Sequence, residues 1–114
     1  MTGLVTTGTW IVAPAKRAAF VQAWASFAEW ASSRPGAGML RLGIDATNPT
    51  RYVSFGEWAD TASVRAWKSA PEFRERIAHV LQHVTEFRPA ELEVVATAAS
   101  GSSTVSVPAA SRAG

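Results

Sequence analysis

The spacing of hydrophobic residues in the first part of the chain predicts a strand followed by a helix. Residues 4–13, LVTTGTWIVA, are rich in the β-branched and aromatic types that favour a strand. From Ala15 to Ser33 the period changes to that of a helix. Pro35 and Gly36 end this helix, because proline cannot continue its hydrogen bonds and glycine accepts the turn. Its predicted buried face carries Phe20, Trp24, Phe27 and Ala31.

A return to alternation predicts a β-hairpin in the middle of the chain. In residues 38–46, and again in residues 51–58, side chains that favour the core alternate with side chains that favour solvent, which is typical of half-buried strands. In the second of these strands, Val53 and Phe55 share one face. The link at residues 47–50, TNPT, is expected to form the turn, because an Asn-Pro pair favours turn initiation. The opposite face of the second strand carries Tyr52, Ser54, Gly56 and Trp58.

Two helical segments and a strand are predicted after the hairpin. Asp60 is expected to cap a helix through Trp67, because its carboxylate can accept the free backbone N–H groups of the first turn. Pro71 suits the first turn of a second helical segment, which is expected to reach about Glu86. The last strand is expected at residues 91–97, which again alternate.

The predicted order of elements is therefore β-α-β-β-α-β. This order is typical of the ferredoxin-like α+β fold, in which helices cover one face of a four-stranded antiparallel sheet. The 114 residues suit a single domain, which we expect to occupy residues 1–97. Residues 98–114 are small and polar, and they are expected to form a flexible C-terminal tail.

Composition and charge exclude several classes of function. The 11 Lys and Arg residues exceed the 9 Asp and Glu residues only slightly and are scattered, so no basic stripe for nucleic acid is expected. The sequence has no cysteine, which excludes disulfides, thiolate catalysis and cysteine-based metal sites. Its N-terminus lacks the basic region of a signal peptide, and no segment approaches the roughly 20 apolar residues that span a bilayer. We therefore expect a cytoplasmic protein that binds neither nucleic acid nor membrane.

The two histidines are the first candidates for chemistry. His79 and His83 stand four residues apart on a predicted helix, a spacing that would let both imidazoles contact one metal ion. A third ligand would have to come from Glu75, Glu86 or a distant carboxylate, and we predict no metal site. Both histidines are expected at the solvent edge of the apolar helix face. Their functional alternative is a general-base role, because an imidazole titrates near neutral pH.

Aromatic residues provide a second candidate site. Tyr52, Ser54 and Trp58 share one strand face and could line a cavity that has Trp67 above it. Such a cavity would be apolar with a few polar tips, which is the composition of many small-molecule sites. The same residues would also serve as ordinary core filling, because small domains use large aromatic side chains to bury area. The hydrophobic pattern alone leaves both interpretations open.

Beyond these patterns, the sequence resembles the antibiotic biosynthesis monooxygenase family. The resemblance is carried by WASFAEWASSRPGAGMLRL and NPTRYVSFGEWADTASVRAWKSAPEF, and it covers residues 5–97. The family pattern is a helix ending in Pro-Gly, a hairpin closing on Trp followed by Asp or Ser, and a helix with Trp before Pro-x-Phe. In this chain these features are Pro35-Gly36, Trp58-Ala59-Asp60, Trp67 and Glu72-Phe73.

The resemblance implies a dimeric α+β barrel with one cavity in each subunit, between the sheet and the helices. It also implies oxidation of an aromatic or polyketide-type small molecule, with molecular oxygen as co-substrate and without a metal or organic cofactor. Trp58 corresponds to the tryptophan that lines the pocket of the anthrone-oxidising members. Their pocket asparagine, tyrosine and histidine correspond to Ser54, Val64 and the neighbourhood of Gly43.

Two functions follow as expectations. The first is a cofactor-independent, monooxygenase-like enzyme of secondary metabolism, with His79 or His83 as the base. The second is a non-catalytic homodimeric binding protein of the same fold, because three of the four pocket residues differ from those of the anthrone-oxidising members. Heme degradation, the activity of another branch, is not expected because the position of its heme-ligating histidine falls on Ile77. In both expectations the pocket is shaped by Tyr52, Ser54, Trp58 and Trp67.

Overall fold

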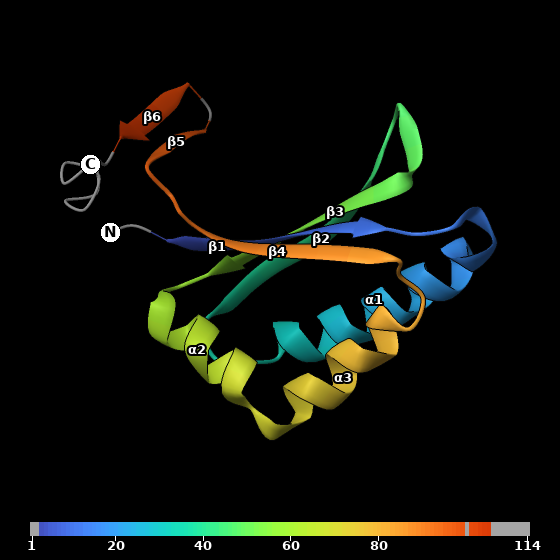
Figure 1. The fold of residues 1–114 in the computed structure, drawn as a ribbon. Helices are drawn as coiled ribbons and strands as arrows, with labels where there is room; N and C mark the ends of the chain where they lie inside the picture. The colour runs from blue at the N-terminus through green and yellow to red at the C-terminus, as the bar shows by residue number, and fades with distance from the viewer. Residues whose placement is uncertain (1–2, 100, 106–114) are drawn as a thin grey trace, which may run out of the picture.

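The computed structural model describes residues 3–99 and 101–105 (Figure 1). A 3₁₀ turn at Pro14–Lys16 precedes the first α-helix. The helices are α1 (Arg17–Ser32), α2 (Thr61–Ser69) and α3 (Pro71–Leu81). The strands are β1 (Leu4–Ile11), β2 (Ala37–Asp45), β3 (Asn48–Trp58), β4 (Glu86–Glu93), β5 (Ala96–Ala99) and β6 (Ser102–Val105). None of the helices in this part of the chain is long and apolar enough to cross a membrane.

Four of the strands form one antiparallel sheet in the order β2-β3-β1-β4. All three helices lie on the same side of this sheet, as Figure 1 shows, and no helix of the described residues covers its other face. The α+β class, the ferredoxin-like order and the four-stranded antiparallel sheet are therefore as predicted. The second helical region consists of two separate helices, α2 and α3, which meet at Ala70.

The core lies between the helices and the inward face of the sheet. The predicted face of α1 is buried, and so are the predicted inward residues of β3. The helix α2 begins as expected, since the Asp60 carboxylate accepts a hydrogen bond of 2.8 Å from the Ser63 backbone N–H. The buried apolar residues of β1, of the segment just after it and of α1 are Trp10, Val12, Phe20, Trp24, Phe27, Ala28 and Ala31.

The region between α3 and β4 corrects two predictions. The helix predicted to reach Glu86 ends at Leu81, and the strand predicted at residues 91–97 runs from Glu86 to Glu93. The backbone N–H and the hydroxyl of Thr85 both donate to the Ile11 carbonyl, over 2.8 and 3.1 Å, which ties the chain to the end of β1. Pro89 can lie within the new strand because β4 is at the edge of the sheet, where a missing N–H is tolerated.

The turn between β2 and β3 is also shifted from its predicted position. Asn48 and the residues after it already belong to β3, and Asp45 pairs with Asn48. The Asp45 carboxylate accepts hydrogen bonds from the backbone N–H of Thr47, its hydroxyl and Arg51. These contacts hold the pKa of Asp45 below its ordinary value, with the Thr47 backbone N–H as the largest cause. The aspartate at its start therefore stabilises the turn, and Asn48 adds to it by accepting hydrogen bonds from the backbone N–H and the hydroxyl of Thr50.

A small hairpin follows the sheet. Strands β5 and β6 pair with each other and with no strand of the four-stranded sheet in the described residues. Figure 1 shows this hairpin on the side of the sheet that faces away from the helices. Residues 106–114 lie outside the described residues. The domain boundary at residue 97 and the flexibility of the tail remain predictions.

Candidate active site

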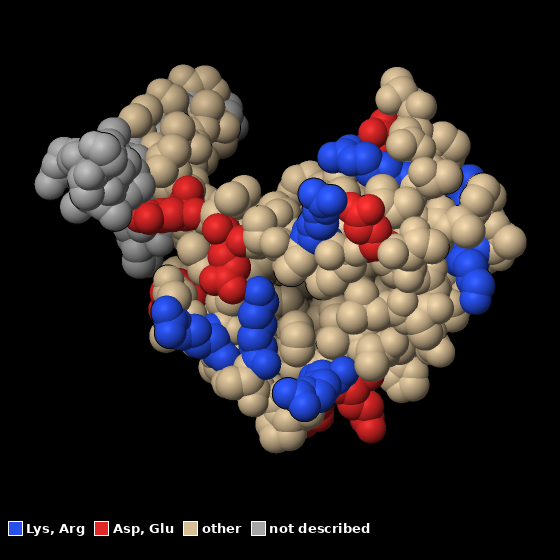
Figure 2. Space-filling view, in the orientation of Figure 1, with Lys and Arg blue, Asp and Glu red and all other residues tan. Residues whose placement is uncertain are grey.

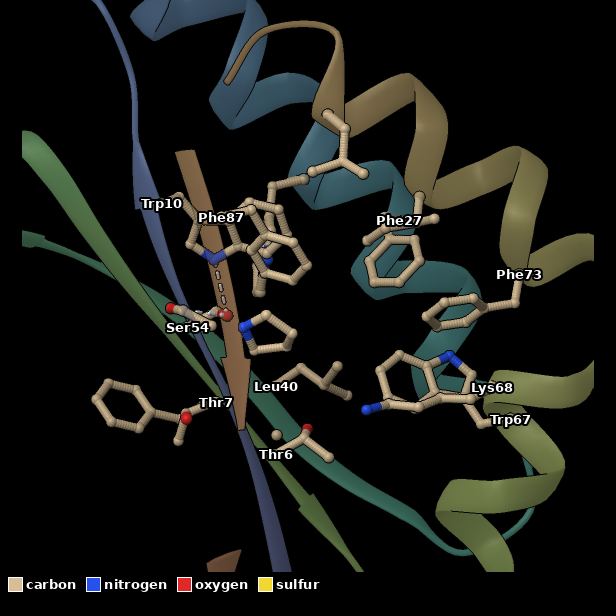
Figure 3. Close-up of a pocket in the computed structure, with 17 residues that line it drawn as sticks. Thr6, Thr7, Trp10, Phe27, Leu40, Ser54, Trp67, Lys68, Phe73 and Phe87 are labelled. Atoms are coloured by element: carbon tan, nitrogen blue, oxygen red, sulfur yellow. Dashed lines mark hydrogen bonds between the residues drawn. The ribbon is translucent and has the colours of Figure 1, made fainter. Parts of the chain in front are cut away.

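A cavity of about 240 Å³ lies between the inward face of the sheet and the helices. Figure 3 shows Trp10 and Phe87 at its sheet side, and Phe27, Phe73 and Trp67 at its helix side. An engineered cavity of about 150 Å³ holds benzene, so this cavity has room for a small aromatic molecule. Apart from the tryptophan indoles, its polar lining side chains are Thr6, Thr7, Ser54 and Lys68.

Two indole N–H groups hydrogen-bond to hydroxyls at the sheet side of the cavity. Trp10 Nε1 donates to Ser54 Oγ over 3.0 Å, and Trp58 Nε1 donates to Thr6 Oγ1 over 3.1 Å. Each hydroxyl oxygen thus accepts from an indole, and its own proton is directed elsewhere. Ser54 donates its proton along a 3.5 Å contact to the Gly8 carbonyl, which is the limit for a hydrogen bond. Thr6 has no acceptor for its proton within the described part of the chain.

A repeated sequence pattern explains why the two pairs match. Residues 6–10, TTGTW, and residues 54–58, SFGEW, both have a hydroxyl residue, a glycine and a tryptophan at every second position. The antiparallel register places Thr6 opposite Gly56, and Gly8 opposite Ser54. Each tryptophan therefore reaches diagonally to the hydroxyl of the other strand. The repeat is readable in the sequence, but its meaning depends on this register, which the sequence alone does not give.

The two glycines of the pattern make room for these hydrogen bonds. A Cβ atom on Gly8 would lie 2.9 Å from Ser54 Oγ, from Trp10 Nε1 and from a ring carbon of Phe87. A Cβ atom on Gly56 would lie 2.8 Å from Thr6 Oγ1 and 3.1 Å from Trp58 Nε1. Contacts this short are repulsive. Any larger residue at either position would push the indole and the hydroxyl out of place.

The tryptophans at the end of β3 and in α2 stack on each other. The ring centres of Trp58 and Trp67 are 4.5 Å apart, with 26° between the planes. Trp67 lines the cavity, whereas Trp58 lies behind it and is outside the lining. Phe73 meets Trp67 edge to face, at 5.0 Å and 88°. The Trp67 indole nitrogen is buried and has no partner among the described residues.

Tyr52 shares the inward face of β3 with Ser54, as predicted, but lies outside the cavity lining. Its ring packs against Phe20 at 5.0 Å, and its buried hydroxyl has no partner within residues 3–99 and 101–105. Of the four predicted pocket residues, the structure brings Ser54 and Trp67 to the cavity. Tyr52 and Trp58 instead belong to the packed core around the cavity.

The two histidines lie away from the cavity. His79 is exposed on α3 and borders a separate hollow together with Ser26 and Arg76. His83 follows α3 and is half-buried, and its Nδ1 has no partner in the described part of the chain. Neither histidine belongs to the residues that line the cavity. No three His, Asp or Glu side chains in the described ranges gather closely enough to hold a metal ion.

Lys68 is the one ionisable side chain in the lining of the cavity, as far as the structure describes it. Its ammonium group forms an ion pair of 2.8 Å with the Glu91 carboxylate, which joins α2 to β4. Figure 2 shows that Lys and Arg are interspersed with Asp and Glu on this side of the molecule. The cavity therefore combines aromatic walls, two oriented hydroxyls and one cation.

Comparison with known protein families shows which family the chain belongs to. The family model for antibiotic biosynthesis monooxygenase matches residues 4–79. The chain belongs to this family. No protein with a curated description matches the chain.

Solved structures of similar fold agree with the family. A variant of SnoaB, a cofactor-independent oxygenase from Streptomyces nogalater, has 18% identity and a TM-score of 0.72, and the match covers 79% of this chain and 90% of that one. A Deinococcus radiodurans protein, provisionally described as an antibiotic biosynthesis monooxygenase, has 17% identity and a TM-score of 0.72, over 80% and 91%. A conserved protein from Methanosarcina mazei has 18% identity and a TM-score of 0.74, over 81% and 92%. At these identities the likeness shows a shared fold.

The family resemblance implies that Trp58 lines the pocket, and the structure of this member of the antibiotic biosynthesis monooxygenase family differs at this point. Trp67 forms the wall, and the Trp58 indole is covered by it. The contribution of Trp58 is indirect, because its N–H fixes the Thr6 hydroxyl that does line the cavity.

Proposed function

We propose that this protein is a cofactor-independent, monooxygenase-like enzyme that oxidises a small aromatic molecule with molecular oxygen. The observation that carries the proposal is a cavity with aromatic walls and two oriented hydroxyls in a chain of the antibiotic biosynthesis monooxygenase family. SnoaB, whose fold is similar, is a cofactor-independent oxygenase. This combination supports oxidation in which the substrate itself supplies the electrons.

The reaction balances without an external reductant. An aromatic ketone whose ring also carries a methylene conjugated with the carbonyl, R₂CH₂, reacts with O₂ to give the quinone, R₂C=O, and H₂O. The carbon loses two hydrogens and gains one oxygen atom, and the second oxygen atom leaves as water. The substrate must first lose a proton, because its anion is electron-rich enough to reduce oxygen. The protein must therefore bind the ring, exclude water and stabilise the substrate oxyanion.

The cavity residues fit these tasks. The aromatic walls, including Trp10, Trp67 and Phe87, would stack on a planar ring. The Thr6 hydroxyl would donate to the substrate oxygen, and the Ser54 hydroxyl would do so by giving up its 3.5 Å contact with the Gly8 carbonyl. The indoles from which both hydroxyls accept would hold them in place. We assign no step to His79 or His83, since neither lines the cavity.

Oxygen uptake tests this function. The purified protein, after treatment with a chelator, would be supplied with an anthrone and separately with 1-naphthol, and oxygen consumption would be followed together with the quinone absorbance. Uptake above the enzyme-free rate, lowered at least tenfold by Phe27→Trp, would support the proposal, because the larger ring would fill the cavity. The matched control is Val21→Trp, which adds an indole at an exposed position of α1 outside the lining. Oxygen uptake no faster than the enzyme-free rate with every substrate of this class would contradict the proposed function.

A second function is favoured by one specific observation. The described lining of the cavity contains no His, Asp, Glu or Tyr that could remove a proton. A binding protein without catalysis would have the same walls and would need no base. Saturable quenching of tryptophan fluorescence by naphthol, without any oxygen uptake, would favour this alternative.

We also propose that the protein is a homodimer formed through the outward face of the sheet. Three large apolar side chains on that face are about half exposed: Met39 (54%), Phe55 (47%) and Leu92 (50%). The β5–β6 hairpin and the tip of the β2–β3 hairpin rise on either side of this face in Figure 1, so a second sheet could lie between them. An apolar patch of this kind is rarely left in contact with water.

Light scattering would measure the mass of the protein in solution. Phe55→Lys is expected to halve the mass from that of two chains to that of one. Val21→Lys is the matched control, because Val21 is similarly exposed at 40% but lies on α1. A single-chain mass for the unaltered protein would exclude the dimer.

A further inference from the structure

The chemical surroundings of Lys68 set it apart from the other charged residues. Every other side chain that the structure describes in the cavity lining is uncharged. The Lys68 side chain is 33% exposed, and Figure 3 shows it reaching from α2 towards the sheet. Its partner Glu91 is more exposed, at 43%, and lies outside the lining. The ammonium group therefore lies between an apolar cavity and a carboxylate that water can reach.

The position of Lys68 is fixed by its neighbour in α2. Trp67 is held between Trp58 and Phe73, so the helix cannot rotate without breaking two aromatic contacts. The Asp60 side chain caps the first turn of the same helix. A lysine held at the wall in this way can change its partner by a rotation of its own side chain, without movement of the backbone.

We propose that Lys68 is the anion-recognition residue of the cavity, and that its ammonium group exchanges the Glu91 carboxylate for the oxyanion of a bound phenolate or enolate. This inference rests on the proposed function for its substrate class. An anion that enters an apolar cavity loses its hydration and requires a partner of opposite charge. Lys68 is the cation that the described lining offers. Glu91 would turn to solvent, where a free carboxylate is well hydrated.

The exchange would explain how a cavity whose described lining holds no histidine or carboxylate can bind an acidic substrate. The anion would be bound from solution and its proton would remain in the solvent, so no internal base is needed. The pair with Lys68 would favour the ionised ligand over the neutral one, because an opposite charge in contact favours the charged form. Lys68 would thus keep the substrate in the form that reacts with oxygen.

A matched pair of ligands tests this inference without any turnover. 4-Nitrophenol ionises to a yellow anion, whereas 4-nitroanisole has nearly the same shape and cannot ionise. Binding of both would be measured by absorbance and calorimetry under nitrogen, at a pH where much of the nitrophenol is ionised. Lys68→Met is expected to weaken nitrophenolate binding by about tenfold or more and to leave nitroanisole binding nearly unchanged. Lys68→Arg should retain the preference for the anion.

The partner residue gives the decisive comparison. Glu91→Gln should tighten nitrophenolate binding, because it removes the carboxylate that competes for Lys68. A purely structural ion pair would make Lys68→Met and Glu91→Gln act in the same direction, and that result would overturn the inference. Lys16→Met is the matched control, since Lys16 is the other lysine of the chain and lies outside the cavity lining. If nitroanisole binds and the two substitutions affect both ligands equally, this inference fails while the aromatic site stands; if neither ligand binds, both proposals fail.

Discussion

The two indole–hydroxyl pairs on the sheet are alike in sequence and differ in what covers them. At one end Trp10 donates to Ser54, and its ring stacks on Phe87 of the edge strand at 4.0 Å and 23°. At the other end Trp58 donates to Thr6, and its ring stacks on Trp67 of α2. The Trp10 ring faces the cavity, while the Trp58 ring is outside the lining.

This difference shows that the role of an aromatic residue depends on the element that packs over it. The strand pattern fixes the hydrogen bond in both cases, because it depends on the register alone. Whether the indole becomes a wall or core filling depends on how the helix residue packs on it: Phe20 of α1 meets the Trp10 ring at a tilt of 52° and leaves it in the cavity lining, whereas Trp67 of α2 stacks on Trp58. Substitutions at the Trp58 end should therefore chiefly lower the stability of the fold, and substitutions at the Trp10 end should chiefly weaken ligand binding.

The largest effect is expected from removing the cover at the Trp58 end. Trp67→Ala should lower the free energy of unfolding by about 3–5 kcal/mol, because it deletes a large buried ring that touches Trp58, Phe27 and Phe73. Phe87→Ala, at the Trp10 end, should cost less because Phe87 is only half-buried. Urea unfolding measures both. An equal loss for the two variants would show that the ends do not differ in the way proposed.

Substitution of the glycines comes next. Gly8→Ala and Gly56→Ala should each cost about 1–3 kcal/mol, since the added methyl would meet a hydroxyl and an indole nitrogen. The loss should be larger for Gly8, where a ring carbon of Phe87 is also 2.9 Å away. Gly43→Ala is the control in the same sheet, because its nearest neighbour is 3.9 Å away and the change should be neutral or stabilising. Urea midpoints that rank Gly43→Ala as the most damaging would refute this account.

The sequence predicts the fold well where a local pattern and the tertiary structure agree. Three features follow from spacing within one element: the buried face of α1, the alternation of buried and exposed residues in β3, and the Asp60 cap of α2. The boundary between α3 and β4 could not be predicted, because the helical spacing continues to Val84 while the contact that stops it comes from Ile11. Pro89 lies within β4, where the edge position permits a residue without an N–H.

The site was predictable only in part for a related reason. Periodicity placed Ser54 and Trp58 on one face of their strand, and in the structure this face is the buried one. It could not distinguish a cavity wall from the layer behind it, because that depends on where α2 crosses the sheet. The histidines were chosen by residue type, although α3 and the turn after it place them away from the cavity. Lys68 was missed because a lone lysine on a helix usually belongs to the solvated surface.

The hydroxyls provide a finer test of the two ends. Thr6→Val should cost about 1–3 kcal/mol, because the Trp58 N–H would be left buried without an acceptor. Ser54→Ala should cost only about 0.5–1.5 kcal/mol, because Trp10 borders the cavity and its N–H can find water there. Denaturant unfolding gives these values, and naphthol titration should show the reverse order of effects on binding. A larger loss of stability at Ser54 would contradict the comparison.

The smallest effect is expected from the cap of α2, and it depends on pH. Hydrogen bonds from the Ser63 hydroxyl and then from its backbone N–H lower the pKa of Asp60, so the folded state favours the carboxylate. This stabilisation is present above the ordinary aspartate pKa of about 4 and is lost as the pH falls through the lower folded value. Asp60→Ala should therefore lower the urea midpoint slightly at neutral pH, and the difference from the unaltered protein should shrink as the solution becomes strongly acidic.

The place in the fold where Asp60→Ala loosens the structure distinguishes the Trp58 end from the Trp10 end. Loosening α2 should speed hydrogen exchange of the Trp58 indole N–H, which Trp67 covers, and leave the Trp10 indole unchanged. Asp45→Ala is the matched control, because the pKa of Asp45 is lowered in the same direction but the residue lies in the β2–β3 turn. It should share the pH dependence of stability and change neither indole. Faster exchange at Trp10 than at Trp58 in Asp60→Ala would show that α2 is not the element that seals the Trp58 end.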